Sequence, residues 1–186
     1  TAIGRGLRRP PATAILVSGG PHLRPEQSTM PSQGPSPRPR VLFLTRRYPP
    51  SIGGIETHCR ELYARLRART PVRLVALRRG HLMHLVWFLP WCLVTAFWLL
   101  LWRRLDAVYF ADGVVASLAA PLRRCFRRPL FVTTVYGLEL RYRHALPRAA
   151  IRCGVRACDW VVVISHNTRA IAASQGVDEA RMRVIH

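Results

Sequence analysis

The sequence predicts an α/β fold for residues 40–186, with a parallel sheet that carries helices on both faces. First, short apolar segments alternate with longer segments along this stretch. Second, the opening segment Val41–Thr45 is continuously apolar up to its last residue, which is typical of a strand buried on both faces. Third, Ile55–Arg69 is apolar on one side only, which indicates an amphipathic helix packed on a sheet. Sequential, right-handed crossovers then give a Rossmann-like sheet.

The remaining elements follow the same alternation of strand and helix. We expect them at Val72–Leu77 (strand), Leu82–Trp102 (helix), Ala107–Phe110 (strand), Val114–Phe126 (helix), Leu130–Val135 (strand), Ala145–Ala157 (helix), Trp160–Ile164 (strand) and Asn167–Ser174 (helix). Met182–His186 has the composition of one more strand, cut short by the end of the sequence.

Residues 1–39 differ from the rest of the chain because they are rich in Pro, Gly, Ser and Arg and show no periodicity. Such a composition predicts a disordered leader. Met30 is a second candidate start, so the residues before it are either a flexible leader or upstream sequence outside the native protein. No apolar segment of signal-peptide length occurs in residues 1–40. The predicted organisation is therefore a leader, 1–39, and one folded domain, 40–186.

The formal net charge is +20, and all 29 basic residues are arginine. Two explanations stay open: a codon bias that enriches arginine, or attraction to anionic lipid headgroups and lipid-linked phosphates. The arginines are scattered in pairs without zinc-finger spacing, so we expect no nucleic-acid partner. The five cysteines are an odd number without a C-x-x-C motif, which favours reduced thiols in a cytoplasmic protein.

The predicted helix Leu82–Trp102 contains no charged side chain and is long enough to cross a hydrocarbon core of about 30 Å. Pro90 interrupts it, and strands of the same predicted sheet lie on both sides of it in the sequence. Three interpretations stay open: a helix that lies in one leaflet, a buried core helix, or a transmembrane span. Its four tryptophans favour the first, an anionic membrane surface as partner.

Ligands of open parallel sheets bind where strands end and loops lead into helices. The loop after the first strand contains Arg46 and the adjacent glycines Gly53 and Gly54. These glycines would let a phosphate approach the free amides of the following helix, although a simple turn has the same sequence. The G-x-G-x-x-G motif of dinucleotide-binding oxidoreductases and the Walker motif are both absent.

Two later strand ends supply carboxylates, Asp112 and Glu139, the second in a loop that also contains Tyr136. Either carboxylate could accept hydrogen bonds from sugar hydroxyls, but Asp112 is equally suited to cap the next helix. Ser165 is a further helix cap whose hydroxyl would face the same cleft, and we assign His58 a structural role. No Ser-His-Asp order, H-E-x-x-H motif or cluster of metal ligands is found in the sequence.

Several segments together resemble the family 4 glycosyltransferases. They are Pro49–His58 (PPSIGGIETH), Asp106–Phe110, Thr134–Glu139, Asp159–Ser165 with Thr168-Arg169, and Gly176-Val177, in the family's order. The resemblance implies the N-terminal, acceptor-side half of a GT-B enzyme that transfers a sugar from a nucleotide-sugar with retention and without an essential metal or other cofactor. It also implies that the sequence is a fragment that ends before the donor-binding domain and is inactive alone.

The resemblance also implies that the donor would face Gly53, Gly54, Arg46 and Ser165. Relatives often have histidines near Tyr136 and Asp112, so these two residues, with Glu139, would take the catalytic or acceptor-orienting roles. The acceptor would be a glycan or a lipid-linked sugar, and the enzyme would be cytoplasmic and peripheral at the inner face of the plasma membrane. The alternative function is a non-catalytic α/β protein anchored by a transmembrane helix at 82–102.

Overall fold

The computed structural model describes residues 38–77, 82–102, 104–141 and 143–185. The chain divides into two units, 1–34 and 35–186, and all described residues belong to the second. The disorder predicted for the leader therefore falls almost entirely outside the described residues.

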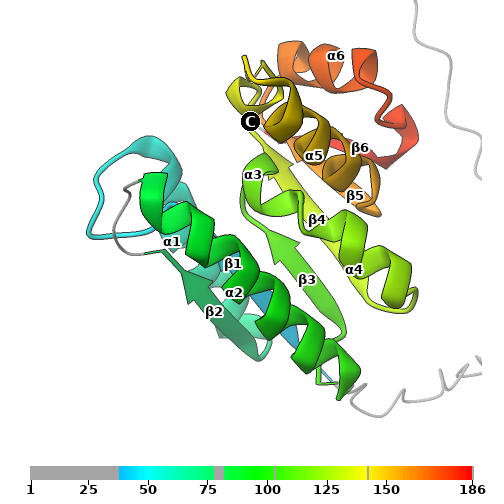
Figure 1. Ribbon diagram of the computed structural model, residues 1–186. Coiled ribbons are helices and arrows are strands. Elements are labelled where there is room, and N and C mark those ends of the chain that lie inside the picture. Colours follow the sequence, from blue (N-terminus) through cyan, green and yellow to red (C-terminus); the bar gives the residue numbers. More distant parts are fainter. Residues whose placement is uncertain (1–37, 78–81, 103, 142, 186) are drawn as a thin grey trace, which may run out of the picture. The chain divides into compact units, whose positions relative to one another are not determined.

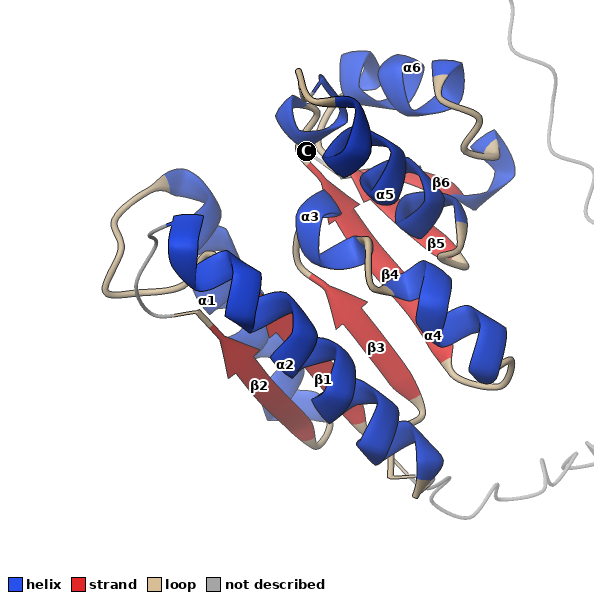
Figure 2. Cartoon of the chain, viewed as in Figure 1, coloured by secondary structure: helices blue, strands red, loops and turns tan. Residues whose placement is uncertain are grey.

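The described residues form a six-stranded sheet in the order β2-β1-β3-β4-β5-β6, and every neighbouring pair is parallel. Val41 at the start of β1 pairs with Val72 on one side and Ala107 on the other. The α/β, Rossmann-like prediction is therefore confirmed (Figure 2). The strands are β1 (Val41–Thr45), β2 (Val72–Ala76), β3 (Ala107–Phe110), β4 (Leu130–Val135), β5 (Trp160–Val163) and β6 (Met182–Val184).

Helices cover the sheet from both faces. Helix α1 packs on one face around Phe43 and Cys59, whereas α2, α3, α4 and α5 enclose the larger core on the other face (Figure 1). The helices are α1 (Gly54–Arg69), α2 (Leu82–Leu101), α3 (Gly113–Ala116), α4 (Ala119–Cys125), α5 (Ala145–Arg156) and α6 (His166–Ser174), with 3-10 turns η1 (Leu138–Arg141) and η2 (Glu179–Arg181).

The single helix predicted at Val114–Phe126 was wrong, because the structure has two helices, α3 and α4, in its place. Pro121 lacks the N–H that would bond to the carbonyl of Ser117 in a continuous helix, so the first helix ends there. The Ser117 hydroxyl donates to the Val114 carbonyl at 2.6 Å and closes the short α3. The break keeps α3 to a single turn directly behind the end of β3.

The order of the strands places the topological switch point of the sheet, which we call the crevice, between the ends of β1 and β3. From β1 the chain runs through α1 to β2, on one side, whereas from β3 it runs through α3 and α4 to β4, on the other. Two neighbouring loops thus leave the sheet in opposite directions, which is where open α/β sheets bind ligands.

Candidate active site

An ion pair crosses the crevice between β1 and β3. Arg46, the first residue after β1, donates from Nε to Oδ1 of Asp112 at 3.2 Å. The Asp112 side chain is almost fully buried and that of Arg46 is largely buried, so water screens this pair less than a surface pair. The structure therefore brings together two of the residues that the sequence nominated separately.

Asp112 is also the N-cap of α3. Its Oδ1 accepts from the backbone N–H of Val114 at 2.8 Å and of Val115 at 3.1 Å. The capping role is therefore real, but it occupies only one oxygen. Oδ2 of Asp112 is buried and has no hydrogen-bond partner among the described residues. A buried carboxylate oxygen without a partner is costly, so this oxygen is suited to accept a hydrogen bond from a water or a ligand.

Glu139 lies beneath this cap and holds two backbone segments together. Its Oε1 accepts from the N–H of Gly113 at 3.3 Å and of Tyr136 at 3.0 Å. The side chain approaches Gly113 so closely that a Cβ there would lie 2.6 Å from Cγ of Glu139. Since Glu139 is buried and engaged with backbone donors, the geometry gives it a positioning role in joining the β3 and β4 loops.

Tyr136 follows β4 and carries a second buried polar atom, its phenolic oxygen, which has no oxygen or nitrogen partner among the described residues and lies near the Cys59 thiol. Burial raises the pKa of Tyr136 well above its ordinary range, and the nearby Cys59 and Asp112 add to the rise. Burial likewise raises the pKa of Cys59. The ring of His58 meets the ring of Tyr136 edge-on, with 6.2 Å between centroids. Tyr136 is thus a neutral hydrogen-bond donor at the same edge as Asp112.

The glycine pair begins α1, with Gly53 as N-cap and Gly54 as the first helical residue. A Cβ at Gly54 would meet no atom within 4 Å, so this side of the helix end is open. At Gly53, a Cβ would lie 2.4 Å from Oε2 of Glu56, whose buried carboxylate pairs with Arg47 at 3.2 Å. Of the two glycines, Gly54 is therefore the one with open space beside it.

Ser165 has a structural task that the sequence also anticipated. Its hydroxyl accepts from the N–H of Thr168 at 3.1 Å and so caps α6. Thr168 in turn packs against Gly137, whose φ of +94° marks a left-handed backbone position in the β4 loop. Ser165 reaches the crevice only through these neighbours, whereas Arg46, Asp112, Tyr136 and Glu139 form one connected group.

Sequence reasoning missed three contacts in or near this group. The ring contact of His58 with Tyr136 places the histidine beside the group, and the structural role that we expected for it stays a prediction. The Arg47–Glu56 pair could have been suspected, because Glu56 is the third residue after the cap Gly53, where a carboxylate reaches back toward the helix start. Thr45, which ends β1 and contacts the Cys59 thiol at 3.6 Å, gave no signal beyond its position. No group of three potential metal ligands occurs among the described residues.

A parallel sheet with polar side chains and an open helix start at its switch point defines one Rossmann-like domain of the GT-B class. The family model for "Glycosyltransferase Family 4" matches residues 52–186. This match covers most of the sequence, and the chain belongs to that family. No curated protein matches the sequence significantly.

Solved structures agree with this fold. One is the apo form of the lipopolysaccharide outer core galactosyltransferase WaaB, with a TM-score of 0.52, 12% identity and coverage of 78% of this chain and 44% of that one. Another is Anabaena Alr3699/HepE in complex with UDP and glucose, with a TM-score of 0.55, 18% identity and coverage of 80% and 44%. The chain thus spans less than half the length of these structures.

Proposed function

We propose that the chain forms the acceptor side of a glycosyltransferase that moves a sugar from a nucleotide-sugar to a hydroxyl group with retention. The carrying observation is a pair of buried oxygens, Oδ2 of Asp112 and the phenolic oxygen of Tyr136, for which the described part of the chain supplies no oxygen or nitrogen partner. An acceptor hydroxyl in the crevice would donate to Oδ2 of Asp112 and accept from the Tyr136 phenol. Both orphaned atoms would then be satisfied, and the attacking oxygen would be held in place.

The donor would approach from the Gly54 side. As the bond between the sugar and the diphosphate breaks, negative charge grows on the departing phosphate, and the free amides at the start of α1 would stabilise it. Arg46, beside the same loop, would add positive charge. The acceptor oxygen would form the new bond on the face that the diphosphate leaves. Its proton, which Oδ2 of Asp112 holds by a hydrogen bond before the attack, would then pass to the departing phosphate oxygen. This scheme assigns no step to a metal.

The comparisons support this proposal at the level of class. HepE was solved with UDP and with UDP-glucose, which favours a nucleotide-sugar as donor. Because this chain spans less than half of the matched structures, the remaining wall of the donor site would come from a second domain. We further propose a glycan or lipid-linked acceptor and a cytoplasmic enzyme that works at the inner face of the plasma membrane.

The test is Asp112→Asn in the intact enzyme, assayed for transfer from a panel of UDP-sugars to membrane extracts. Asn retains the helix-capping ability of Asp but removes the negative charge, so the fold should persist while transfer falls by about tenfold or more. The matched control is Asp178→Asn, which changes an exposed cap, that of η2, away from the crevice. Equal transfer by both variants and the wild type would refute the role of Asp112.

A further inference from the structure

Helix α2 is apolar on both of its sides, and only one of them is covered. Phe88, Cys92 and Ala96 pack into the core against the sheet. The opposite side forms a continuous exposed stripe along the helix. This α2 stripe consists of Trp87, Trp91, Val94, Trp98, Leu101 and Trp102, each between 54% and 81% exposed.

The helix is long and apolar enough to cross a membrane by length and composition alone. Its surroundings in the fold argue against a span. The strands on either side of it in the sequence, β2 and β3, both pair with β1 in one sheet. A crossing would have to separate these strands and strip Phe88 and Cys92 from the core. The side of α2 that carries Phe88 and Cys92 is thus part of the domain core. The packing of the domain does not explain why the opposite side is also apolar.

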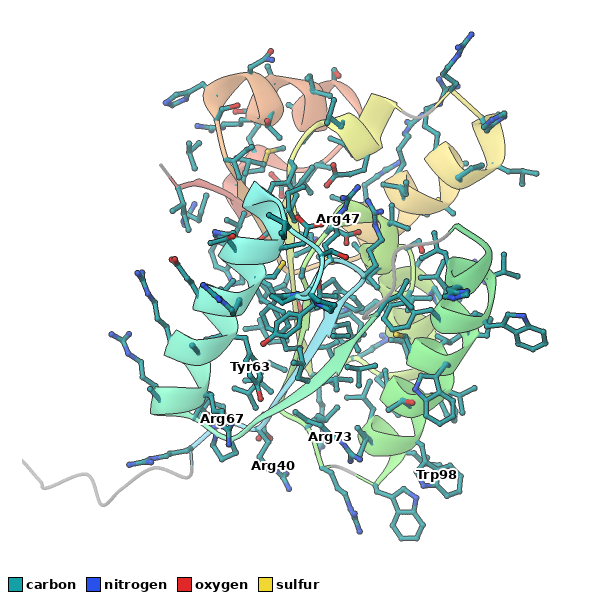
Figure 3. The ribbon with its side chains drawn as sticks, turned by 90° about the vertical axis from the view of Figure 1, so that its left-hand side faces the viewer. Arg40, Arg47, Tyr63, Arg67, Arg73 and Trp98 are labelled. Carbon is teal, nitrogen blue, oxygen red and sulfur yellow. The ribbon has the colours of Figure 1, made fainter. Side chains whose placement is uncertain are left out.

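Two arginine-lined cavities flank the end of α2. One, of about 770 Å³, has five arginines and no acidic residue in its described lining and reaches Leu99 of α2. Figure 3 shows Arg67, Arg73 and Arg40 of this cavity at the same end of the domain as Trp98, which points away from the sheet. The other cavity, of about 630 Å³, places Arg127 and Arg128 beside Leu100 and Leu101.

Little acidic charge balances these arginines. Across both cavities the described lining contains a single carboxylate, Asp106, and Arg40 pairs with it at 3.4 Å. Arg73, Arg104 and Arg127 are exposed and have no acidic partner within ion-pair distance among the described residues. Excess positive charge therefore lies at the end of the domain where α2 ends.

We propose that the α2 stripe and the arginines at its end form a docking surface for an anionic lipid bilayer. Tryptophan is favoured at the boundary between headgroups and acyl chains, and arginine can hold its charge at phosphate level while its stem lies along apolar surface. A helix that lies in this boundary combines apolar burial with attraction to anionic lipids. The stripe supplies the first component and the two cavities supply the second.

Docking in this way has a consequence for the crevice. Because β2 leads into α2, the beginning of the helix lies toward the carboxyl edge of the sheet, where the crevice opens. Trp87, the most exposed tryptophan, is near this beginning. A bilayer on the stripe would therefore run along the domain toward the candidate site and present lipid-linked acceptors to it. The docking itself does not depend on the proposed transferase activity.

The first experiment measures flotation of the intact protein with vesicles of phosphatidylcholine alone or with 30% phosphatidylglycerol. We expect binding to the anionic vesicles, weakened in 0.5 M NaCl. Trp87→Gln/Trp91→Gln should lower the partition coefficient about tenfold or more. The control Leu146→Gln/Ile185→Gln removes exposed apolar side chains elsewhere and should bind as the wild type does.

A second experiment tests the arginines. Arg73→Gln/Arg104→Gln should weaken binding to anionic vesicles by about tenfold, since each basic residue near such a surface contributes to the attraction. Arg148→Gln/Arg152→Gln lowers the net charge equally on the exposed side of α5 and should have a much smaller effect. Equal losses in the two variants would mean that only the overall charge matters and would overturn the assignment.

Fluorescence gives a direct readout of the stripe. The chain has five tryptophans, and Trp160→Phe leaves only the four of the α2 stripe. Brominated lipids should quench this variant strongly, and its emission should shift to the blue. No quenching and no flotation would overturn the proposal. So would a vesicle-independent dimer that Trp87→Gln/Trp91→Gln dissolves, because the stripe would then bind a second copy of the chain.

Discussion

Nε of Arg46 donates to Oδ1 of Asp112 at 3.2 Å, although the two residues are 66 positions apart in the sequence. This contact ties the loop after β1 to the loop after β3 at the point where the chain leaves the sheet in opposite directions. It leaves Oδ2 of the same carboxylate buried without a partner among the described residues. One carboxylate therefore caps a helix and closes an ion pair with the same oxygen, and its other oxygen is available to accept a further hydrogen bond.

Asp112→Ala should destabilise the domain, whereas Asp112→Asn should do so far less. Alanine removes the bonds to Val114 and Val115 and with them about 1 kcal/mol of capping. Denaturant unfolding of both variants measures the difference. Equal stabilities of the two variants would show that the cap contributes nothing.

Gly113→Ala should destabilise the domain by about 1–3 kcal/mol, because the new Cβ would overlap Cγ of Glu139. The displaced Glu139 would also lose its bonds to the backbone of Gly113 and Tyr136. Gly54→Ala is the matched control, since its Cβ would enter open space. It should leave the stability unchanged or slightly higher, but it should raise the KM for the nucleotide-sugar if the diphosphate binds there. An unchanged KM would argue against that part of the proposal.

Tyr136→Phe should separate stability from function. The hydroxyl of Tyr136 is buried without an oxygen or nitrogen partner among the described residues, so its removal relieves a desolvation cost. We expect the same or a higher unfolding free energy together with weaker use of the acceptor. A loss of stability without a change in acceptor KM or kcat would show that the phenol serves the fold alone.

Stability should fall as the pH rises above about 9. Burial raises the pKa of Cys92 from 9.0 to about 12 and the pKa of Tyr109 from 10.0 to about 12. The folded state keeps these protons longer than the unfolded state, so their stabilisation is complete below pH 9 and is lost toward pH 12. Unfolding free energies measured from pH 7 to 11 give the slope of stability against pH. Cys92→Ala should make this slope less steep just above pH 9. A flat profile would contradict the shifts.

The sequence predicted the sheet well because buried strands need continuous apolar segments. Val41–Thr45 was found on this ground and Leu130–Val135 from the alternation of strand and helix, and both are strands. The split of Val114–Phe126 was missed although Pro121 was visible, because the break also depends on how α3 packs close to α5. A Cβ at Gly154 of α5 would lie 2.0 Å from the carbonyl of Ala116, which shows how close this packing is.

The candidate site was predictable in its members but not in their contacts. Asp112, Glu139 and Tyr136 follow strand ends, and the strand ends of a parallel sheet share one edge, so their nomination needed only the order of elements. Which oxygen of Asp112 is occupied and which is free depends on Arg46 and on the backbone of α3. The contact of His58 with Tyr136 depends on where the first turns of α1 lie relative to the loop after β4.

The sequence alone was sufficient for the fold class and for the loops that carry the site, because both follow from local apolar patterns and chain order. It left three interpretations of the segment 82–102 open, since an apolar sequence does not show whether protein or lipid covers its side chains. Only the tertiary structure assigned the sides of α2, with Cys92 against the sheet and Trp87 exposed. The same holds for Arg46 and Asp112, because contacts between distant residues exist only after the strands have paired.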